Sequence, residues 1–207
     1  QMVLIRSEIR GNTLFLEAPG QPPLEMPLIP ESGAEVDVCI FGKKCSAWET
    51  SEAAGKWFSN FLEHPSRPVF MPDSNRREVD PDYAAFPSRT SFTDGFPFLL
   101  IGEASLDDLN GRLEQPVQMR RFRPNLVING SEAFVEDRMK RVKIGELSFQ
   151  VAKPCGRCRV TTVDPETGEF SGKDPLKTLS SFRRHNGEAL FGQNLIHEQQ
   201  GLLQVGD

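Results

Sequence analysis

Residues 147–163 read LSFQVAKPCGRCRVTTV, and this stretch decides how the chain is interpreted. Its β-rich beginning, residues 147–154, and its β-branched end, residues 159–163, predict two strands. The thiols of Cys155 and Cys158 would then lie on the turn between those strands. Thiolates are soft metal ligands, and the flanking arginines favour the thiolate form. We therefore expect a rigid platform that exposes one thiolate ligand.

The residues alone leave four interpretations of the two cysteines open. A thioredoxin-type redox pair needs its first cysteine at a helix N-terminus, and the β-branched run after Cys158 argues against a helix there. A structural zinc site needs two more ligands, and Cys39 and Cys45 are over a hundred residues away. Two plain buried thiols are the third interpretation. The fourth is a single thiolate that binds a metal-bearing cofactor, with basic neighbours holding the anionic groups of that cofactor.

Charge is distributed unevenly along the chain. The whole sequence of 207 residues has a net charge of −5, which argues against a general nucleic-acid binder. Residues 119–159 nevertheless contain ten Lys/Arg and four Asp/Glu, a balance of +6, so the rest carries −11. This block is either a solvated basic face or a pocket for a small, strongly anionic ligand.

The sequence shows no signal peptide and no apolar run long enough to span a membrane. Four cysteines are too few for a disulfide scaffold, so a reducing, cytoplasmic setting is expected. The chain starts at Gln1 in a strand-like run and stops at Asp207 without a closing element. We therefore expect a fragment of a longer protein.

Hydrophobic patterns predict a mixed α+β protein that is mainly β. Strands are expected at residues 2–5, 13–16, 36–41, 45–48, 96–101, 117–119, 126–128, 142–144, 147–151, 159–163 and 202–205. Helices are expected at residues 50–63, 104–113 and 176–184. The Pro-rich stretch 65–87 is expected to be a long loop containing the domain boundary. A partial N-terminal region would then cover residues 1–75, and a β-barrel domain with peripheral helices residues 76–207.

Several ordered motifs resemble the MOSC domains, which are named for the C-terminal domain of molybdenum-cofactor sulfurases. These motifs are FRPNLVI (122–128), Glu136-Asp137, Ile144-Gly145, KPCGRCRVTTVDPETG (153–168), DPLKTL (174–179), Phe182-Arg183, FGQN (191–194) and QVGD (204–207). The resemblance is dense from about Thr90 onward and looser before it. Bacterial YcbX-like proteins are the most similar subgroup, with the mitochondrial amidoxime reducing component as a eukaryotic relative.

This resemblance implies a molybdenum cofactor, a pyranopterin dithiolene with a terminal phosphate. Cys158 would be the protein ligand to molybdenum, and Cys155 a structural neighbour. The residues implied to contact or support the cofactor are Arg123, Asn125, Gly156, Arg157, Asp94, Gly95 and Asn194. Arginine suits this role because its planar fork makes paired hydrogen bonds to phosphate.

The resemblance further implies an oxidoreductase of the bacterial cytoplasm that reduces N-hydroxylated compounds such as hydroxylamino-purines and amidoximes. Its electrons would come from a flavoprotein or iron–sulfur partner, and no nucleic acid or membrane would be bound. A cofactor carrier or sulfur-transfer module without turnover is the alternative. Relatives begin with a Lys-Ser pair and a later Asp-Arg segment that this chain lacks. We therefore expect the fragment to bind the cofactor weakly or to be inactive.

Overall fold

The computed structural model describes all 207 residues, which divide into two compact units. Unit 1 comprises Gln1–Arg77 and Pro165–Glu169, and unit 2 comprises Glu78–Asp164 and Phe170–Asp207. Strands outnumber helices in both units, which confirms the predicted mixed, mainly β fold.

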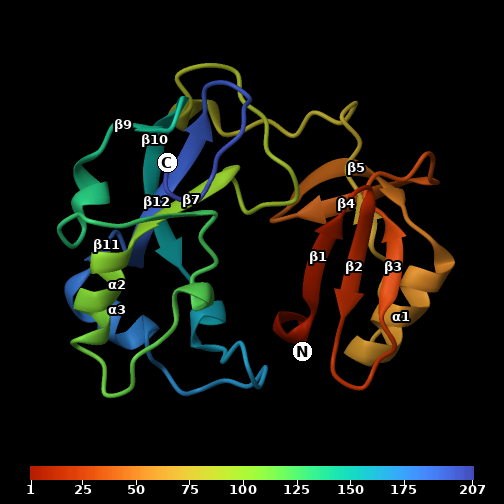
Figure 1. Ribbon diagram of the computed structural model, residues 1–207, viewed down its shortest axis with the longest axis horizontal. Coiled ribbons are helices and arrows are strands. Elements are labelled where there is room, and N and C mark those ends of the chain that lie inside the picture. The colour runs from red at the N-terminus through yellow and green to blue at the C-terminus, as the bar shows by residue number, and fades with distance from the viewer. The chain divides into compact units, whose positions relative to one another are not determined.

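Unit 1 is built from two three-stranded antiparallel sheets and one helix (Figure 1). Its elements are η1 (Met2–Leu4), β1 (Arg6–Arg10), β2 (Thr13–Glu17), β3 (Leu24–Pro27), β4 (Glu35–Ile40), β5 (Lys43–Glu49), α1 (Glu52–Leu62) and β6 (Val69–Phe70). Helix α1 begins after Ser51, whose hydroxyl accepts the amide hydrogen of Ala54 at 3.2 Å. Ala54 and Trp57 form its buried face, as the apolar spacing predicted.

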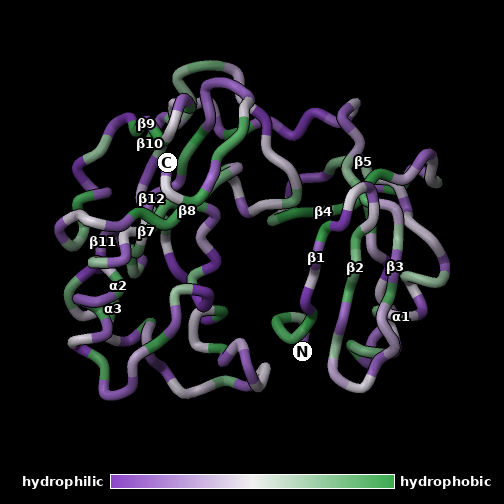
Figure 2. The backbone as a smooth tube through the Cα atoms, in the orientation of Figure 1, coloured by the Kyte–Doolittle hydropathy of each residue, from purple (hydrophilic) through white to green (hydrophobic).

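Two predictions for residues 1–87 need correction. Residues 2–4 form the 3-10 turn η1 in place of a strand, and the first strand starts only at Arg6. Figure 2 shows this turn as a hydrophobic segment beside the N-terminus, and hydrophobicity alone does not separate a strand from a turn. The stretch 65–87, predicted as a plain loop, contains strand β6 and the 3-10 turn η2 (Pro81–Tyr83).

Unit 2 is built around one six-stranded sheet in the order β8-β7-β12-β10-β9, with β11 paired to β12. Only β7 and β8 are parallel. The strands of this unit are β7 (Phe98–Gly102), β8 (Leu126–Ile128), β9 (Arg141–Ile144), β10 (Leu147–Arg157), β11 (Arg184–His185) and β12 (Glu188–His197). Its helices and further 3-10 turns are α2 (Glu103–Asn110), η3 (Met119–Arg121), η4 (Val135–Arg138), η5 (Arg159–Thr162) and α3 (Leu176–Phe182).

The core of unit 2 lies on both faces of this sheet. Leu100 and Ile101 are neighbours in β7, are both fully buried and belong to two different hydrophobic clusters. Successive residues of a strand point to opposite faces, so the two clusters cover opposite sides. Leu109 of α2 and Leu179 of α3 belong to the cluster of Ile101. Both helices therefore pack against the same face of the sheet.

Three segments of unit 2 differ from their predicted structure. Residues 119–121 form the 3-10 turn η3, so no strand exists at 117–119. Residues 159–162 form η5, so the predicted strand at 159–163 is wrong as well. No strand forms at 202–205, where Leu202 and Val205 are fully exposed.

Candidate cofactor-binding site

The CGRC motif lies at the end of strand β10 and not on a turn between two strands. Strand β10 continues through Arg157 and is paired with β12 from Phe149 to Arg157. The register of this pairing shifts between Val151 and Lys153 and again between Pro154 and Gly156. Such irregularities bend a strand and redirect its side chains. They occur here in the segment that leads to Cys158.

Cys158 occupies the N-cap position of η5, with an extended backbone. Its carbonyl oxygen accepts two hydrogen bonds from Thr161, one from the amide at 3.2 Å and one from the hydroxyl at 3.0 Å. The hydroxyl of Thr162 donates in the same way to the carbonyl of Arg159 at 2.8 Å. These bonds turn the chain directly after Cys158 and leave its free thiol exposed.

The two thiols of the motif are not equivalent. Cys155 is half-buried, and its sulfur accepts a hydrogen bond from Nη1 of Arg157 at 3.0 Å, whereas Cys158 is exposed. All four cysteines of the chain are free thiols. No group of three or more His, Cys, Asp or Glu side chains is placed to hold a metal ion. An exposed thiolate of Cys158 can therefore serve as one ligand to a group that brings its other ligands with it.

Arg157 connects the CGRC strand to the FRPN segment. Its Nη2 donates to the carbonyl oxygen of Phe122 at 2.7 Å, and its guanidinium carbon lies 5.5 Å from the centre of the Phe122 ring. Phe122 is fully buried against Phe191 of β12, with ring centroids 4.5 Å apart. The remaining guanidinium nitrogen, Nε, is buried and has no partner.

In the FRPN segment, the side chain of Arg123 is exposed and Asn125 is hydrogen-bonded to strand β7. Arg123 is exposed, forms no ion pair and has a left-handed backbone with φ of 55°. Asn125 forms two hydrogen bonds with the backbone of Leu99. Its backbone N–H donates to the Leu99 carbonyl oxygen at 3.0 Å, and its side-chain oxygen Oδ1 accepts the Leu99 amide hydrogen at 2.9 Å. Asn125 thus fixes the segment to β7, so that Arg123 is presented from an anchored turn.

Asn194 and Gly156 lie on the paired strands β12 and β10. Asn194 is opposite Lys153 of β10 on one side and Leu99 of β7 on the other, and its side chain donates to the carbonyl of Pro154 at 3.4 Å. A Cβ atom on Gly156 would lie 2.8 Å from a carboxylate oxygen of Glu188. Glycine is therefore required here unless that flexible carboxylate moves.

Asp94 and Gly95 lie in a bend before β7, within a long segment that packs on β10. The Nζ atom of Lys153 lies 4.5 Å from the ring centre of Tyr83 and 5.6 Å from that of Phe96. The side chain of Gln150 bonds to the same segment, donating to the carbonyl of Tyr83 and accepting the amide hydrogen of Ala85, both at 3.0 Å. This segment thus carries Asp94 and Gly95 toward the strand that leads to Cys158.

Sequence reasoning gave no role to the Glu136-Asp137 pair beyond its place in a motif. The carboxylate of Glu136 is fully buried and accepts hydrogen bonds from the amide of Gly102 at 3.1 Å and from the hydroxyl of Ser105 at 2.7 Å. It therefore caps the start of α2. Asp137 accepts from the buried Gln193 at 2.8 Å and pairs with Arg183 at 2.5 Å. The pair is structural, because it ties η4 to the sheet.

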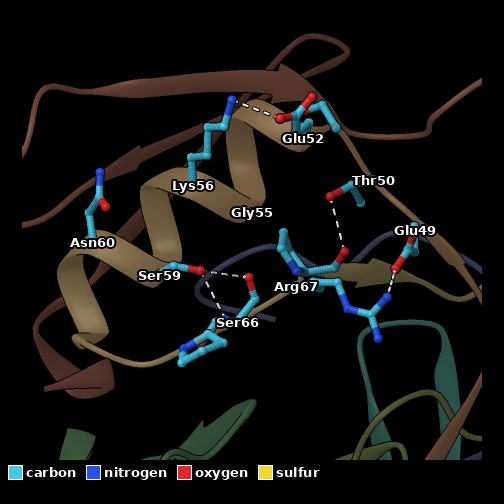
Figure 3. Close-up of a pocket in the computed structure, with 12 residues that line it drawn as sticks. Glu49, Thr50, Glu52, Gly55, Lys56, Ser59, Asn60, Ser66 and Arg67 are labelled. Carbon is cyan, nitrogen blue, oxygen red and sulfur yellow. Dashed lines mark hydrogen bonds and ion pairs between the residues drawn. The ribbon is translucent and has the colours of Figure 1, made fainter.

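A separate hollow of about 810 Å³ lies in unit 1, between α1 and residues 65–68 (Figure 3). Its cations are already paired, Lys56 with Glu52 at 2.7 Å and Arg67 with Glu49. The hydrogen bond from Lys56 lowers the pKa of the Glu52 carboxyl below its usual value. None of the residues predicted to contact a cofactor lines this hollow.

Comparison with known proteins agrees with this architecture. The family model described as "MOSC domain" matches residues 87–207, and that described as "MOSC N-terminal beta barrel domain" matches residues 1–65. Mitochondrial amidoxime-reducing component 1 is 34% identical in Xenopus laevis and 36% identical in Homo sapiens. Mitochondrial amidoxime reducing component 2 of Rattus norvegicus is 34% identical.

Each of these three alignments covers the whole of this chain, which spans 65% or 66% of the length of those relatives. A solution structure of a Bordetella bronchiseptica protein is 24% identical over 34% of this chain and 57% of its own. Its TM-score is 0.30, too low to bear on the fold. No helix of this chain has the length and hydrophobicity that a membrane crossing requires.

One prediction is overturned by these relatives. They are named as mitochondrial and come from vertebrates, so the expected bacterial cytoplasmic location is wrong. The MOSC model covers more than half of the chain, and its residues are those that form the six-stranded sheet and carry the CGRC and FRPN segments. The chain therefore belongs to the MOSC domain family.

Proposed function

We propose that this chain is the molybdenum-cofactor-binding part of an oxidoreductase that reduces N-hydroxylated compounds, with Cys158 as the protein ligand to the metal. The observation that carries the proposal is the placement of the Cys158 thiol. It is free and exposed at the end of a bulged strand, where η5 turns the backbone away from it. Names of the curated relatives, amidoxime-reducing components, support the same class of reaction.

The residues present fit such a cofactor. A thiolate is a soft ligand of the kind that proteins offer to transition metals. Arg123 is an exposed cation without an ion pair, and Arg157 keeps a buried Nε with no partner, so both have donors left for an anionic group. Glycine at position 156 leaves the backbone exposed within the motif. Unoccupied donors in a basic region suit a ligand that carries phosphate.

Within this proposal each residue has a separate task. Cys158 holds the metal, Arg123 holds the anionic part of the pterin, and Gly156 offers its backbone. Arg157 keeps the CGRC strand and the FRPN segment together through Phe122. Asn125 anchors the FRPN segment to β7, and Asn194 binds the Pro154 carbonyl of β10. Asp94 and Gly95 would contact the cofactor, as the family resemblance implies.

When bound, the cofactor supplies two-electron redox chemistry that amino-acid side chains lack. The overall reaction converts a hydroxylamine R–NHOH, two electrons and two protons into the amine R–NH₂ and water, so the N–O bond breaks. The electrons come from a flavoprotein or iron–sulfur partner in this proposal. The chain spans about two thirds of its curated relatives, so the activity is assigned to the intact protein.

The test uses full-length protein purified from a host that makes the cofactor. Molybdenum content is measured by elemental analysis, and turnover by reduction of an amidoxime and a hydroxylamino-purine with reduced methyl viologen as donor. We expect Cys158→Ala to lose both metal and turnover, whereas the matched variant Cys155→Ala keeps both. Unchanged metal content and turnover in Cys158→Ala would overturn the assignment. Metal bound without any N-reduction would instead support the cofactor-carrier or sulfur-transfer alternative.

A further inference from the structure

A second hollow of unit 2 lies next to Cys158 along the chain. It has a volume of about 500 Å³, within the range of small-molecule sites. Its walls come from η5, from the segment 170–173 and from helix α3. None of the residues that the family resemblance assigns to the cofactor lines it.

All charged side chains that line this hollow are positive. Arg159, Lys173 and Lys177 line it, and no aspartate or glutamate does. None of the three cations forms an ion pair, unlike Lys56 and Arg67 in the hollow of unit 1. Cations gathered without a counter-ion repel one another, and a bound anion relieves this repulsion. The hollow is therefore suited to a phosphate or carboxylate.

An exposed aromatic ring forms the other half of the hollow. Phe170 is 57% exposed, a large value for a side chain of this size, and the guanidinium carbon of Arg159 lies 4.4 Å from its ring centre. The backbone that carries the ring is fixed, because Phe170 forms a β-bridge with Val163 and the amide of Ser171 donates to the carbonyl of Thr162 at 2.9 Å. An exposed ring with a guanidinium over one face is a platform on which a flat heteroaromatic ligand stacks.

We propose that this hollow binds a small planar heteroaromatic ligand that carries a phosphate, of the class of the nucleoside monophosphates. The base stacks on Phe170 and Arg159, and the phosphate lies between Lys173 and Lys177. The hollow shares no lining residue with the proposed cofactor site, and the proposal does not depend on the proposed reaction. Ligand binding in the hollow would still be expected if the protein reduced no N-hydroxylated compound.

Binding is measured by calorimetry on the whole chain with three probes: adenosine monophosphate, adenosine and inorganic phosphate. We expect one site for adenosine monophosphate, with an affinity at least about tenfold higher than for either half alone, because stacking and charge-assisted hydrogen bonds act together. Equal affinity for adenosine and adenosine monophosphate, or no saturable binding, would overturn the proposal.

Variants assign the binding to the hollow. The double variant Lys173→Gln/Lys177→Gln should weaken adenosine monophosphate about tenfold or more, whereas the control Lys140→Gln/Lys143→Gln, with the same charge change on other exposed lysines of unit 2, should not. Phe170→Ala should weaken adenosine monophosphate but not phosphate, and thermal melting checks that it folds. Equal weakening by the two double variants would contradict the site.

A last pair of measurements separates this hollow from the cofactor site. Cys158→Ser should bind adenosine monophosphate as the unchanged chain does. Protein loaded with cofactor should do so too. If loading with cofactor abolishes the binding, the hollow belongs to the cofactor and the proposal is wrong, even though the proposed function would stand.

Discussion

Arg157 and Phe122 join two segments that lie 35 positions apart in the sequence, through a hydrogen bond of 2.7 Å from Nη2 to the Phe122 carbonyl. The same guanidinium donates to Cys155 and lies near the Phe122 ring. The CGRC strand and the FRPN segment are thereby held as one unit. The arginine next to Cys158 thus links the two segments, and its buried Nε has no hydrogen-bond partner.

Removing this tie should destabilise unit 2. We expect Arg157→Gln to lower the free energy of unfolding by about 2 kcal/mol, because two hydrogen bonds from a charged donor are lost. Urea denaturation measures the loss. Arg184→Gln, on the exposed strand β11, is the matched control and should stay within about 0.5 kcal/mol of the unchanged chain. Equal losses in the two variants would contradict the role of Arg157.

The buried carboxylate of Glu136 gives a second prediction. Glu136→Leu removes both acceptor oxygens, so the amide of Gly102 and the hydroxyl of Ser105 lose their buried partner. We expect a loss of about 2–3 kcal/mol in the free energy of unfolding, measured in urea. Glu132→Leu removes a carboxylate of the same region that is exposed and paired with Arg138, so its cost should be below about 1 kcal/mol. A small effect of Glu136→Leu would show that the network is not needed.

The hydrophobic pattern of the sequence predicted those helices and strands whose structure depends mainly on their own residues. The spacing of Ala54 and Trp57 predicted α1, and the apolar runs predicted β7, β8 and most of β10. Two-residue strands such as β6 and β11 were not predicted, because their pairing depends on a partner distant in sequence. The predicted strand at 202–205 failed for the same reason, since no partner strand lies beside it.

The sequence predicted which residues belong to the candidate site but not how the structure places them. The β-branched residues after Cys158 indicate a strand by propensity, yet Thr161 and Thr162 bond back to carbonyls three residues earlier. Threonine hydroxyls compete with strand hydrogen bonds in this way. The difference in burial between Cys155 and Cys158 also depends on where Arg157 is placed, which no local pattern shows.

The hydroxyl of Thr161 should control the accessibility of Cys158. Thr161→Val removes the 3.0 Å bond to the Cys158 carbonyl at a cost of about 1 kcal/mol and leaves only the amide bond at 3.2 Å. The less firmly held backbone should change the rate at which the thiol reacts with a disulfide reagent. Ser181→Ala is the control, because Ser181 also bonds to a carbonyl three residues earlier, but in α3. A changed Cys158 rate in both variants, or in neither, would contradict this role.

Gly192 lies at a close approach between β12 and β7. Its φ is +81°, and an added Cβ would lie 2.7 Å from Cγ1 of Ile101 and 2.8 Å from the carbonyl oxygen of Leu100. Gly192→Ala should cost about 3 kcal/mol, from backbone strain and overpacking together. Gly187→Ala shares the positive φ, at +87°, but meets no atom within 4 Å, so only about 1 kcal/mol is expected. Thermal unfolding of both variants separates the two contributions.

Lys153 should hold the segment that carries Asp94 and Gly95 against β10. Its Nζ lies 4.5 Å from the ring centre of Tyr83, and such a contact contributes about 1 kcal/mol. Lys153→Met keeps the apolar stem but loses the charge, so the segment should open more often. Trypsin cleavage after the exposed Arg89 measures this opening.

We expect Lys153→Met to raise the cleavage rate about fivefold, the population change that corresponds to 1 kcal/mol. Lys143→Met, which removes an exposed lysine from β9, should leave the rate unchanged. In a Tyr83→Leu background the effect of Lys153→Met should shrink, because the ring that attracts the cation is gone. An undiminished effect in that background would assign the closure to the contact of Lys153 with Phe96, whose ring centre lies 5.6 Å from Nζ.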